Sequence, residues 1–123
     1  MEPFIKKLIL TRIVITGPES TGKSELTEKL ANHFGGVAVP EYAREFISAL
    51  DRPYNESDVF AICKRQIEQI SESRRESDLI FFDTGLIITK VWLEMGFNLK
   101  PRWIDQAIRS AGIDLYLLCA PDI

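Results

Sequence analysis

The pattern of hydrophobic and polar positions along the chain predicts strands and helices in alternation. Short apolar runs, typical of strands buried on both faces, lie at residues 8–16, 37–39, 79–83 and 115–119. Apolar residues at helical spacing fill the intervals and predict helices at residues 25–34, 41–50, 85–95 and 101–111. A further helix is expected to begin near Asn55 or Ser57. Strands separated by helices favour an α/β fold, with a parallel sheet covered by helices on both faces.

Apolar spacing also indicates which side of a predicted helix faces the core. At residues 25–34, Leu26, Leu30 and Phe34 recur every four positions with Ala31 beside them, so we expect this stripe to pack on the sheet. Residues 85–95 are apolar on nearly all sides. That pattern favours a helix buried at a cleft or an interface.

One stretch carries a recognisable chemical motif. Residues 17–24 read GPESTGKS and fit the Walker A pattern, which follows a strand and opens a helix. Its glycines let the backbone wrap around phosphates, Lys23 offers a positive charge, and the Ser24 hydroxyl can ligate Mg²⁺. The alternative, a chance match on a turn, is disfavoured by the flanking strand and helix. The residues expected to bind the nucleotide are Gly17, Glu19, Ser20, Thr21, Gly22, Lys23, Ser24 and Glu25.

Two carboxylates follow strands in the same way as the phosphate loop. Glu41 comes just after the strand at residues 37–39, and Asp83 ends the strand at residues 79–83. Ligands of open parallel sheets bind at the carboxyl ends of the strands. We therefore expect the phosphate loop, Glu41 and Asp83 to form one site.

Each carboxylate has a functional and a structural interpretation. Asp83 can hold Mg²⁺ beside Ser24, as a Walker B acid does, or it can be a turn-forming aspartate, since Thr84 and Gly85 follow. Glu41 can take the proton of a substrate hydroxyl, or it can be a first-turn glutamate favoured by the helix dipole. The catalytic candidates are Lys23, Glu41 and Asp83, and which carboxylate is the general base stays open.

Three further side chains are candidates for contacting a substrate. Arg44 lies one helical turn after Glu41 and can bind a substrate or form an ion pair with Glu41. Tyr42 and Trp92 can stack on a flat ring, although most aromatic residues at such positions belong to the core.

Composition bounds the classes of function. With 123 residues, 46% hydrophobic and 27% charged, the chain is expected to form a single globular domain. Its net charge of −3 gives no reason to expect binding to nucleic acid or to acidic membranes. Cys63 and Cys119 fit no metal or redox spacing, which favours free thiols. No apolar stretch is long enough to span a bilayer and no signal peptide is visible, so we expect a cytoplasmic protein.

Several segments together resemble one family. They are GPESTGKS at residues 17–24, VPEYARE at 39–45, FFDT at 81–84, TKVW at 89–92 and DLYLLCAPDI at 114–123. In combination they are similar to the ribosylnicotinamide (nicotinamide riboside) kinase domain of NadR-type proteins, a P-loop kinase of the AAA-like ATPase grouping. The resemblance covers residues 13–123 and is more specific than the Walker A pattern alone.

This resemblance implies a kinase that uses ATP and Mg²⁺ to phosphorylate the ribose 5′-hydroxyl of nicotinamide riboside, in NAD salvage. Its phosphate, metal and substrate contacts carry over to Lys23, Ser24, Asp83, Glu41, Arg44 and Trp92. Two alternatives stay open: a nucleotide-binding or regulatory module, and a P-loop kinase of another nucleoside.

The chain departs from the family's pattern in two places. Gly85 stands where relatives often carry a second acid, so we expect a different arrangement beside the metal. The family's domain also continues past the segment at residues 120–123 into a lid with arginines and a last strand. Residues 1–123 are therefore expected to be one incomplete P-loop kinase-like domain. Such arginines are worth on the order of 10³ to 10⁵ in rate, so we expect nucleotide binding with poor turnover. An incomplete sheet edge favours homo-oligomers.

Overall fold

The computed structural model describes residues 11–18, 22–73 and 79–120, and its elements follow the expected alternation. The strands are β1 (Thr11–Thr16), β2 (Val37–Val39), β3 (Leu79–Asp83) and β4 (Leu115–Leu118). The helices are α2 (Lys23–Phe34), α3 (Tyr42–Ser48), α4 (Glu56–Ser73), α5 (Leu86–Phe97) and α6 (Arg102–Ser110). Residues 8–10 of the first predicted strand lie outside the described residues.

The four strands form one parallel sheet in the order β2-β3-β1-β4, which confirms the predicted α/β fold. β1 lies between β3 and β4, and its Ile15 is paired with Asp83 of β3. The phosphate loop and Asp83 therefore leave the sheet from adjacent strands, at the same edge.

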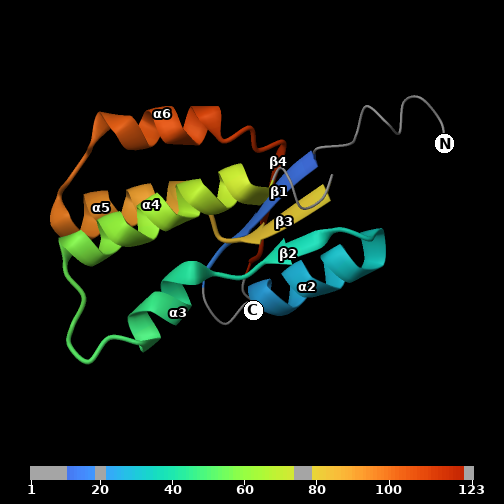
Figure 1. Ribbon diagram of the computed structural model, residues 1–123, viewed down its shortest axis with the longest axis horizontal. Coiled ribbons are helices and arrows are strands. Elements are labelled where there is room, and N and C mark those ends of the chain that lie inside the picture. Colours follow the sequence, from blue (N-terminus) through green and yellow to red (C-terminus); the bar gives the residue numbers. More distant parts are fainter. Residues whose placement is uncertain (1–10, 19–21, 74–78, 121–123) are drawn as a thin grey trace.

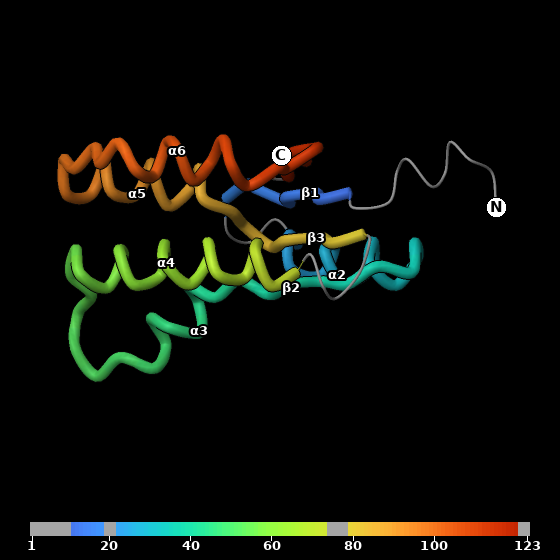
Figure 2. The backbone as a smooth tube through the Cα atoms, turned by 45° about the horizontal axis from the view of Figure 1, so that its top comes forward, coloured from blue at the N-terminus to red at the C-terminus, as the bar shows by residue number. Residues whose placement is uncertain are grey.

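Helices cover both faces of the sheet because side chains alternate along each strand. Val14 and Phe82 face a core shared with α4, α5 and α6, whereas Ile15 and Phe81 face α2. Figure 1 shows α2 beside β2 and β3, apart from the group formed by α4, α5 and α6. Figure 2 shows α5 and α6 running side by side, with α3 below α4. None of the helices in the described ranges is long and apolar enough to cross a bilayer.

The predicted core face of α2 is correct only in part, since Ala31 is buried against the sheet and Leu30 packs against the same cluster. Leu26 and Phe34 are 36% and 60% exposed, and the buried residues of this helix are Lys23, Thr27 and Ala31. α2 starts directly at the phosphate loop, so the side chain of Lys23 must turn toward the strand ends. Thr27 and Ala31 lie on the same helical face, four residues apart. Their small side chains allow the helix to approach the sheet closely.

Helices α4 and α5 begin close to their predicted starts. Asn55 caps α4, because its Oδ1 accepts a hydrogen bond from the Asp58 N–H at 3.1 Å. α5 is anchored by the buried residues Leu86, Thr89 and Leu93, and the Thr89 hydroxyl donates to Gln66 of α4 at 2.6 Å. The other apolar side chains of α5, such as Ile88, are partly exposed at the cleft described below.

Both cysteines are free, and their burial differs. Cys63 is fully buried on α4 and Cys119 is half-buried. Burial raises the pKa of the Cys63 thiol to about 11, so almost none of it is thiolate at pH 8. We expect iodoacetamide at pH 8 to modify Cys119 in the folded protein and Cys63 only after denaturation. Peptide mass spectrometry measures this, and rapid modification of Cys63 under native conditions would contradict the burial.

Candidate active site

The phosphate loop begins where β1 and β4 approach each other. The Cys119 N–H donates to the Thr16 carbonyl oxygen at 2.8 Å. Gly17 follows with φ 138°, and a Cβ at this position would lie 2.4 Å from the Cys119 carbonyl oxygen. Only glycine fits there. Gly22, with φ 76°, is the N-cap of α2. Three residues predicted to bind the nucleotide lie outside the described residues: Glu19, Ser20 and Thr21.

Lys23 lies at the centre of a polar cluster at the strand ends. Its ammonium donates to Asp83 Oδ1 at 2.6 Å, to Thr84 Oγ1 at 2.7 Å and to Glu41 Oε2 at 3.0 Å. An ammonium group has three N–H donors, and each has an acceptor here. The structure thus brings together the three predicted catalytic residues and adds Thr84.

The pKa of Lys23 reflects two opposing effects. Burial of the side chain lowers it, but hydrogen bonds to Asp83 and Glu41, helped by their charges, outweigh burial and raise the pKa above its ordinary value. Lys23 is therefore fully charged at neutral pH. A buried cation between two carboxylates is electrostatically suited to exchange one partner for a phosphate oxygen.

Ser24 and Asp83 provide oxygen atoms beside Lys23. The Ser24 hydroxyl donates to Asp83 Oδ2 at 2.5 Å, while the other carboxylate oxygen accepts from Lys23. Hydroxyl and carboxylate oxygens are the hard donors that Mg²⁺ prefers, and Mg²⁺ in phosphate-transfer sites takes few protein ligands. The pair therefore fits a metal held mainly by phosphates and water. No group of three or more His, Cys, Asp or Glu side chains with metal-binding geometry occurs in the described ranges.

Glu41 and Arg44 extend the cluster from the start of α3. Glu41 is the N-cap residue of α3, and Arg44, one turn later, lies 3.4 Å from Glu41 Oε2 and 3.4 Å from Ser24 Oγ. The Arg44 side chain is half exposed, so both contacts are weak. Arg44 is placed where its guanidinium can reach an anion above the cluster.

The cluster opens into a cleft of about 770 Å³, within the size range of ligand sites. Lys23, Glu41 and Thr84 line the cleft together with Trp92 and Ile88 of α5. Trp92 meets Tyr54 edge to face, with ring centroids 5.0 Å apart, and the Trp92 Nε1–H donates to the Tyr54 hydroxyl at 3.2 Å. The predicted Trp92 thus lines this cleft together with an aromatic residue that the sequence reasoning missed.

Tyr54 is fixed by an anchored loop between α3 and α4. Arg52 forms a two-pronged ion pair with Asp58 at 2.7 and 2.9 Å, and the Asn55 N–H donates to the same carboxylate at 2.8 Å. These contacts hold the loop on both sides of Tyr54. In the sequence this stretch only marks the break between two helices, and a loop aromatic beside Pro53 was the one available signal.

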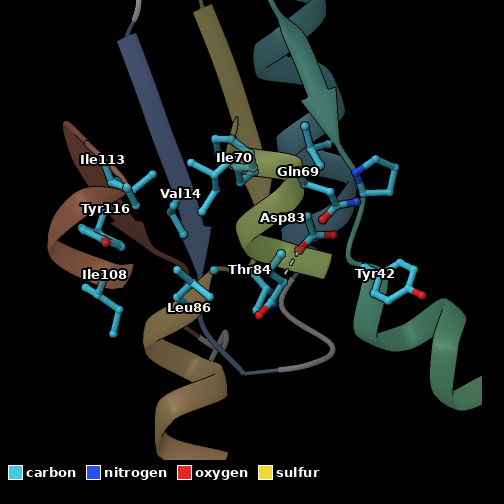
Figure 3. A pocket seen from close by; sticks show the side chains of 16 residues that line it. Val14, Tyr42, Gln69, Ile70, Asp83, Thr84, Leu86, Ile108, Ile113 and Tyr116 are labelled. Atoms are coloured by element: carbon cyan, nitrogen blue, oxygen red, sulfur yellow. Dashed lines mark hydrogen bonds between the residues drawn. The ribbon is translucent and has the colours of Figure 1, made fainter. Parts of the chain in front are cut away.

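Two predicted residues lie away from the cleft. Tyr42 packs against Phe46 and lines a separate small cavity of about 20 Å³ behind Asp83, with room for about one water molecule (Figure 3). Glu25 forms a solvent-exposed pair with Lys29 at 3.0 Å. Neither side chain faces the cleft that Lys23 lines.

Gly85 stands next to Thr84, close to the pair formed by Ser24 and Asp83. It is buried, and a Cβ at this position would lie 3.2 Å from a methyl group of Val14. The position therefore faces an apolar side chain, and the carboxylate that ends β3 is that of Asp83 alone.

Comparisons with known proteins find similar sequences and similar structures. Two curated proteins, the trifunctional NAD biosynthesis/regulator proteins NadR of Salmonella typhimurium and of Escherichia coli, are each 24% identical to this chain over 120 residues. The matches cover 93% of this chain and 29% of each relative, so this chain spans less than a third of their length.

Solved structures share the fold. A crystal structure of NadR protein in complex with NR matches with a TM-score of 0.80 at 22% identity, over 94% of this chain and 35% of that one. NadR protein in complex with NAD and AMP-PNP matches with a TM-score of 0.69 at 23% identity, over 89% of this chain and 34% of that one. Thymidylate kinase from Ehrlichia chaffeensis matches with a TM-score of 0.64 at 17% identity, over 89% of this chain and 71% of that one.

The sequence also matches a family model, described as an AAA domain, over residues 12–123. That span includes the described phosphate-loop residues, both strand-end carboxylates and the aromatic wall of the cleft. With nearly its whole length matched, this chain belongs to the AAA domain family of P-loop proteins.

Proposed function

We propose that this chain is the phosphate-transferring part of a kinase that uses ATP to phosphorylate the ribose 5′-hydroxyl of nicotinamide riboside. One observation carries the proposal: the Lys23 ammonium contacts both Glu41 and Asp83, and Lys23 lines a cleft of about 770 Å³. A phosphate-binding cation thus lies within 3.0 Å of a carboxylate that can receive a hydroxyl proton. Similarity to NadR, solved in complex with NR and with AMP-PNP, supports the choice of substrates.

The position of each residue in the site indicates its role in the proposed reaction. Lys23 and the N-terminus of α2 bind the nucleotide phosphates, and Arg44 reaches toward the same charge from α3. Ser24 and Asp83 are the residues that would hold Mg²⁺, which when bound neutralises charge on the transferred phosphoryl group. Glu41, at the cleft, is then the carboxylate that orients the ribose hydroxyl and accepts its proton. This division assigns the base to Glu41, because both oxygens of Asp83 are engaged by Lys23 and Ser24.

The test is phosphorylation of a defined acceptor. The protein is incubated with ATP, Mg²⁺ and nicotinamide riboside, and the phosphorylated riboside is measured by mass spectrometry. Cytidine, uridine and thymidine monophosphate serve as comparison acceptors. Product formed from the riboside alone supports the proposal, whereas product from another acceptor makes the chain a kinase of that class. Nucleotide binding without transfer to any acceptor would favour a binding or regulatory module.

The aromatic wall supplies a sharper test of the acceptor. Stacking of a base on an aromatic side chain is worth about 1–3 kcal/mol. We therefore expect Trp92→Ala to raise the KM for the riboside by about tenfold or more, with the KM for ATP within about twofold of wild type. Steady-state kinetics with each substrate varied in turn measures both constants.

Trp103→Ala is the matched control for this prediction. Trp103 packs on Phe60, with ring centroids 5.8 Å apart, and does not line the cleft. Its replacement should leave the riboside KM unchanged. Equal increases in both variants would mean that loss of a tryptophan, and not loss of stacking, causes the effect.

A further inference from the structure

Thr84 has a backbone conformation that its side chain disfavours. Among the described residues, only Thr84 and Asn98 have a positive φ without being glycine, at 70° and 54°. Asn98 is unremarkable there, because asparagine tolerates the left-handed region and the residue forms the C-cap of α5. A β-branched residue such as threonine is a true outlier in this region.

The surrounding structure holds Thr84 in this conformation. Its N–H donates to the carbonyl oxygen of Ile15 of β1 at 2.8 Å, two residues before Gly17 of the phosphate loop. Figure 3 shows Asp83 and Thr84 next to each other at the end of β3, and a hydrogen bond of 3.4 Å runs from the Thr84 hydroxyl to Asp83 Oδ1. Strain at such a position persists only where neighbouring contacts over-determine it.

The strained backbone presents the Thr84 hydroxyl to Lys23. The ammonium donates to this hydroxyl at 2.7 Å, a shorter distance than to Glu41, and within residues 11–18, 22–73 and 79–120 Thr84 is its only neutral acceptor. A glycine here would relieve the backbone but would remove that acceptor. Serine is the one smaller residue that retains a hydroxyl without the branch at Cβ.

We propose that Thr84 is a positioning residue: its strained backbone directs the hydroxyl at the Lys23 ammonium. This contact fixes the ammonium at the strand ends, where nucleotide phosphates would bind. The nucleotide part of this inference rests on the proposed function. The contact with Lys23 and the strain do not, and they can be measured without nucleotide.

Three substitutions separate the hydroxyl from the strain. Thr84→Val keeps the branched shape and removes the hydroxyl, Thr84→Ser keeps the hydroxyl, and Thr84→Gly removes both the hydroxyl and the strain. We expect Val and Gly to weaken binding of AMP-PNP with Mg²⁺ by about tenfold, as for loss of a hydrogen bond to a charged group, and Ser to stay within about twofold. Isothermal titration calorimetry measures these affinities.

Thermal unfolding tests the strain itself. Thr84→Gly should melt about 5 °C above Thr84→Val, although glycine normally destabilises a folded chain, because only valine retains the unfavourable left-handed conformation. Asn98→Gly, the control, should change the melting temperature little. A Thr84→Gly variant that melts at or below Thr84→Val would overturn the strain argument.

The rate at which acetic anhydride acetylates Lys23, followed by mass spectrometry without nucleotide, reports the contact directly. It should rise in Thr84→Val and stay at the wild-type rate in Thr84→Ser. Unchanged acetylation together with unchanged or tighter AMP-PNP binding in Thr84→Val would overturn the proposed role. If wild type itself binds no AMP-PNP, the proposed function fails, and acetylation and melting still decide whether Thr84 positions Lys23.

Discussion

Replacing Lys23 by alanine is expected to abolish nucleotide binding and to lower the free energy of unfolding by about 3 kcal/mol at pH 7. The ammonium has two carboxylate partners, and the side chains of Lys23 and Asp83 are only 4% and 3% exposed. Its removal leaves two close carboxylates without their buried counter-charge, and the phosphates lose the buried cation that binds them. Binding of AMP-PNP and urea denaturation measure the two effects.

The loss of stability in Lys23→Ala has a defined control. Lys29→Ala breaks the exposed pair with Glu25, both of whose side chains are 71% exposed, so its stability should not change measurably. Adding Asp83→Asn to Lys23→Ala removes one of the unpaired charges and should recover part of the stability, without restoring nucleotide binding. If the single and double variants are equally unstable, unpaired charge is not the cause.

The raised pKa of Lys23 predicts that the stability of the fold decreases at high pH. Because its pKa is higher in the folded protein than in the unfolded chain, the stabilisation is fully present below the unfolded pKa of about 10.5 and is lost as pH rises through the folded value. Lys23→Ala should lack this part of the alkaline destabilisation. Urea denaturation of both proteins between pH 9 and about pH 11.5 measures the difference, and parallel profiles would contradict it.

Gly17→Ala is expected to destabilise the fold by about 4 kcal/mol and to separate β4 from β1. A Cβ at position 17 would lie 2.4 Å from the Cys119 carbonyl oxygen, a backbone atom that cannot move aside alone. The φ of 138° adds conformational strain for any residue with a side chain. Urea denaturation measures the stability, and exchange of the Cys119 amide, bonded to Thr16, reports on the strand pair.

Gly22→Ala separates steric clash from backbone strain. Gly22 also has a positive φ, 76°, but no other atom of the part of the chain that the structure describes lies within 4 Å of its Cβ position. Its replacement should cost about 1 kcal/mol, the ordinary penalty of a left-handed residue. Equal losses at Gly17 and Gly22 would show that the approach of Cys119 plays no part.

The central residues of the site could be predicted from the sequence, because the carboxyl ends of all strands of a parallel sheet lie at the same edge. The apolar run before Asp83, the Walker A residues and Glu41 each follow a strand, so the topology alone places Lys23, Glu41 and Asp83 together. No knowledge of side-chain packing was needed for that step. The phosphate loop itself is predicted by a motif whose spacing has a direct physical cause.

The rest of the site depends on orientation, which apolar spacing does not fix. The rotation of α2 is set by where Lys23 must point, and this overrides the stripe that contains Leu26 and Phe34. Tyr54 reaches the cleft through an anchored loop, whose path no periodicity describes. The positive φ of Thr84 could not be predicted from the sequence, because threonine disfavours that conformation.

The place of β1 inside the sheet has a consequence for the order of folding. The neighbours of β1 are residues 79–83 and 115–118, so the strand gains its partners only after these later residues have left the ribosome. The Walker A residues are synthesised before both of these partner strands, and Gly17 can close against Cys119 only once β4 has been made. If nucleotide binding needs this contact between Gly17 and Cys119, a nascent chain will bind an ATP analogue only after β1 has paired with β4.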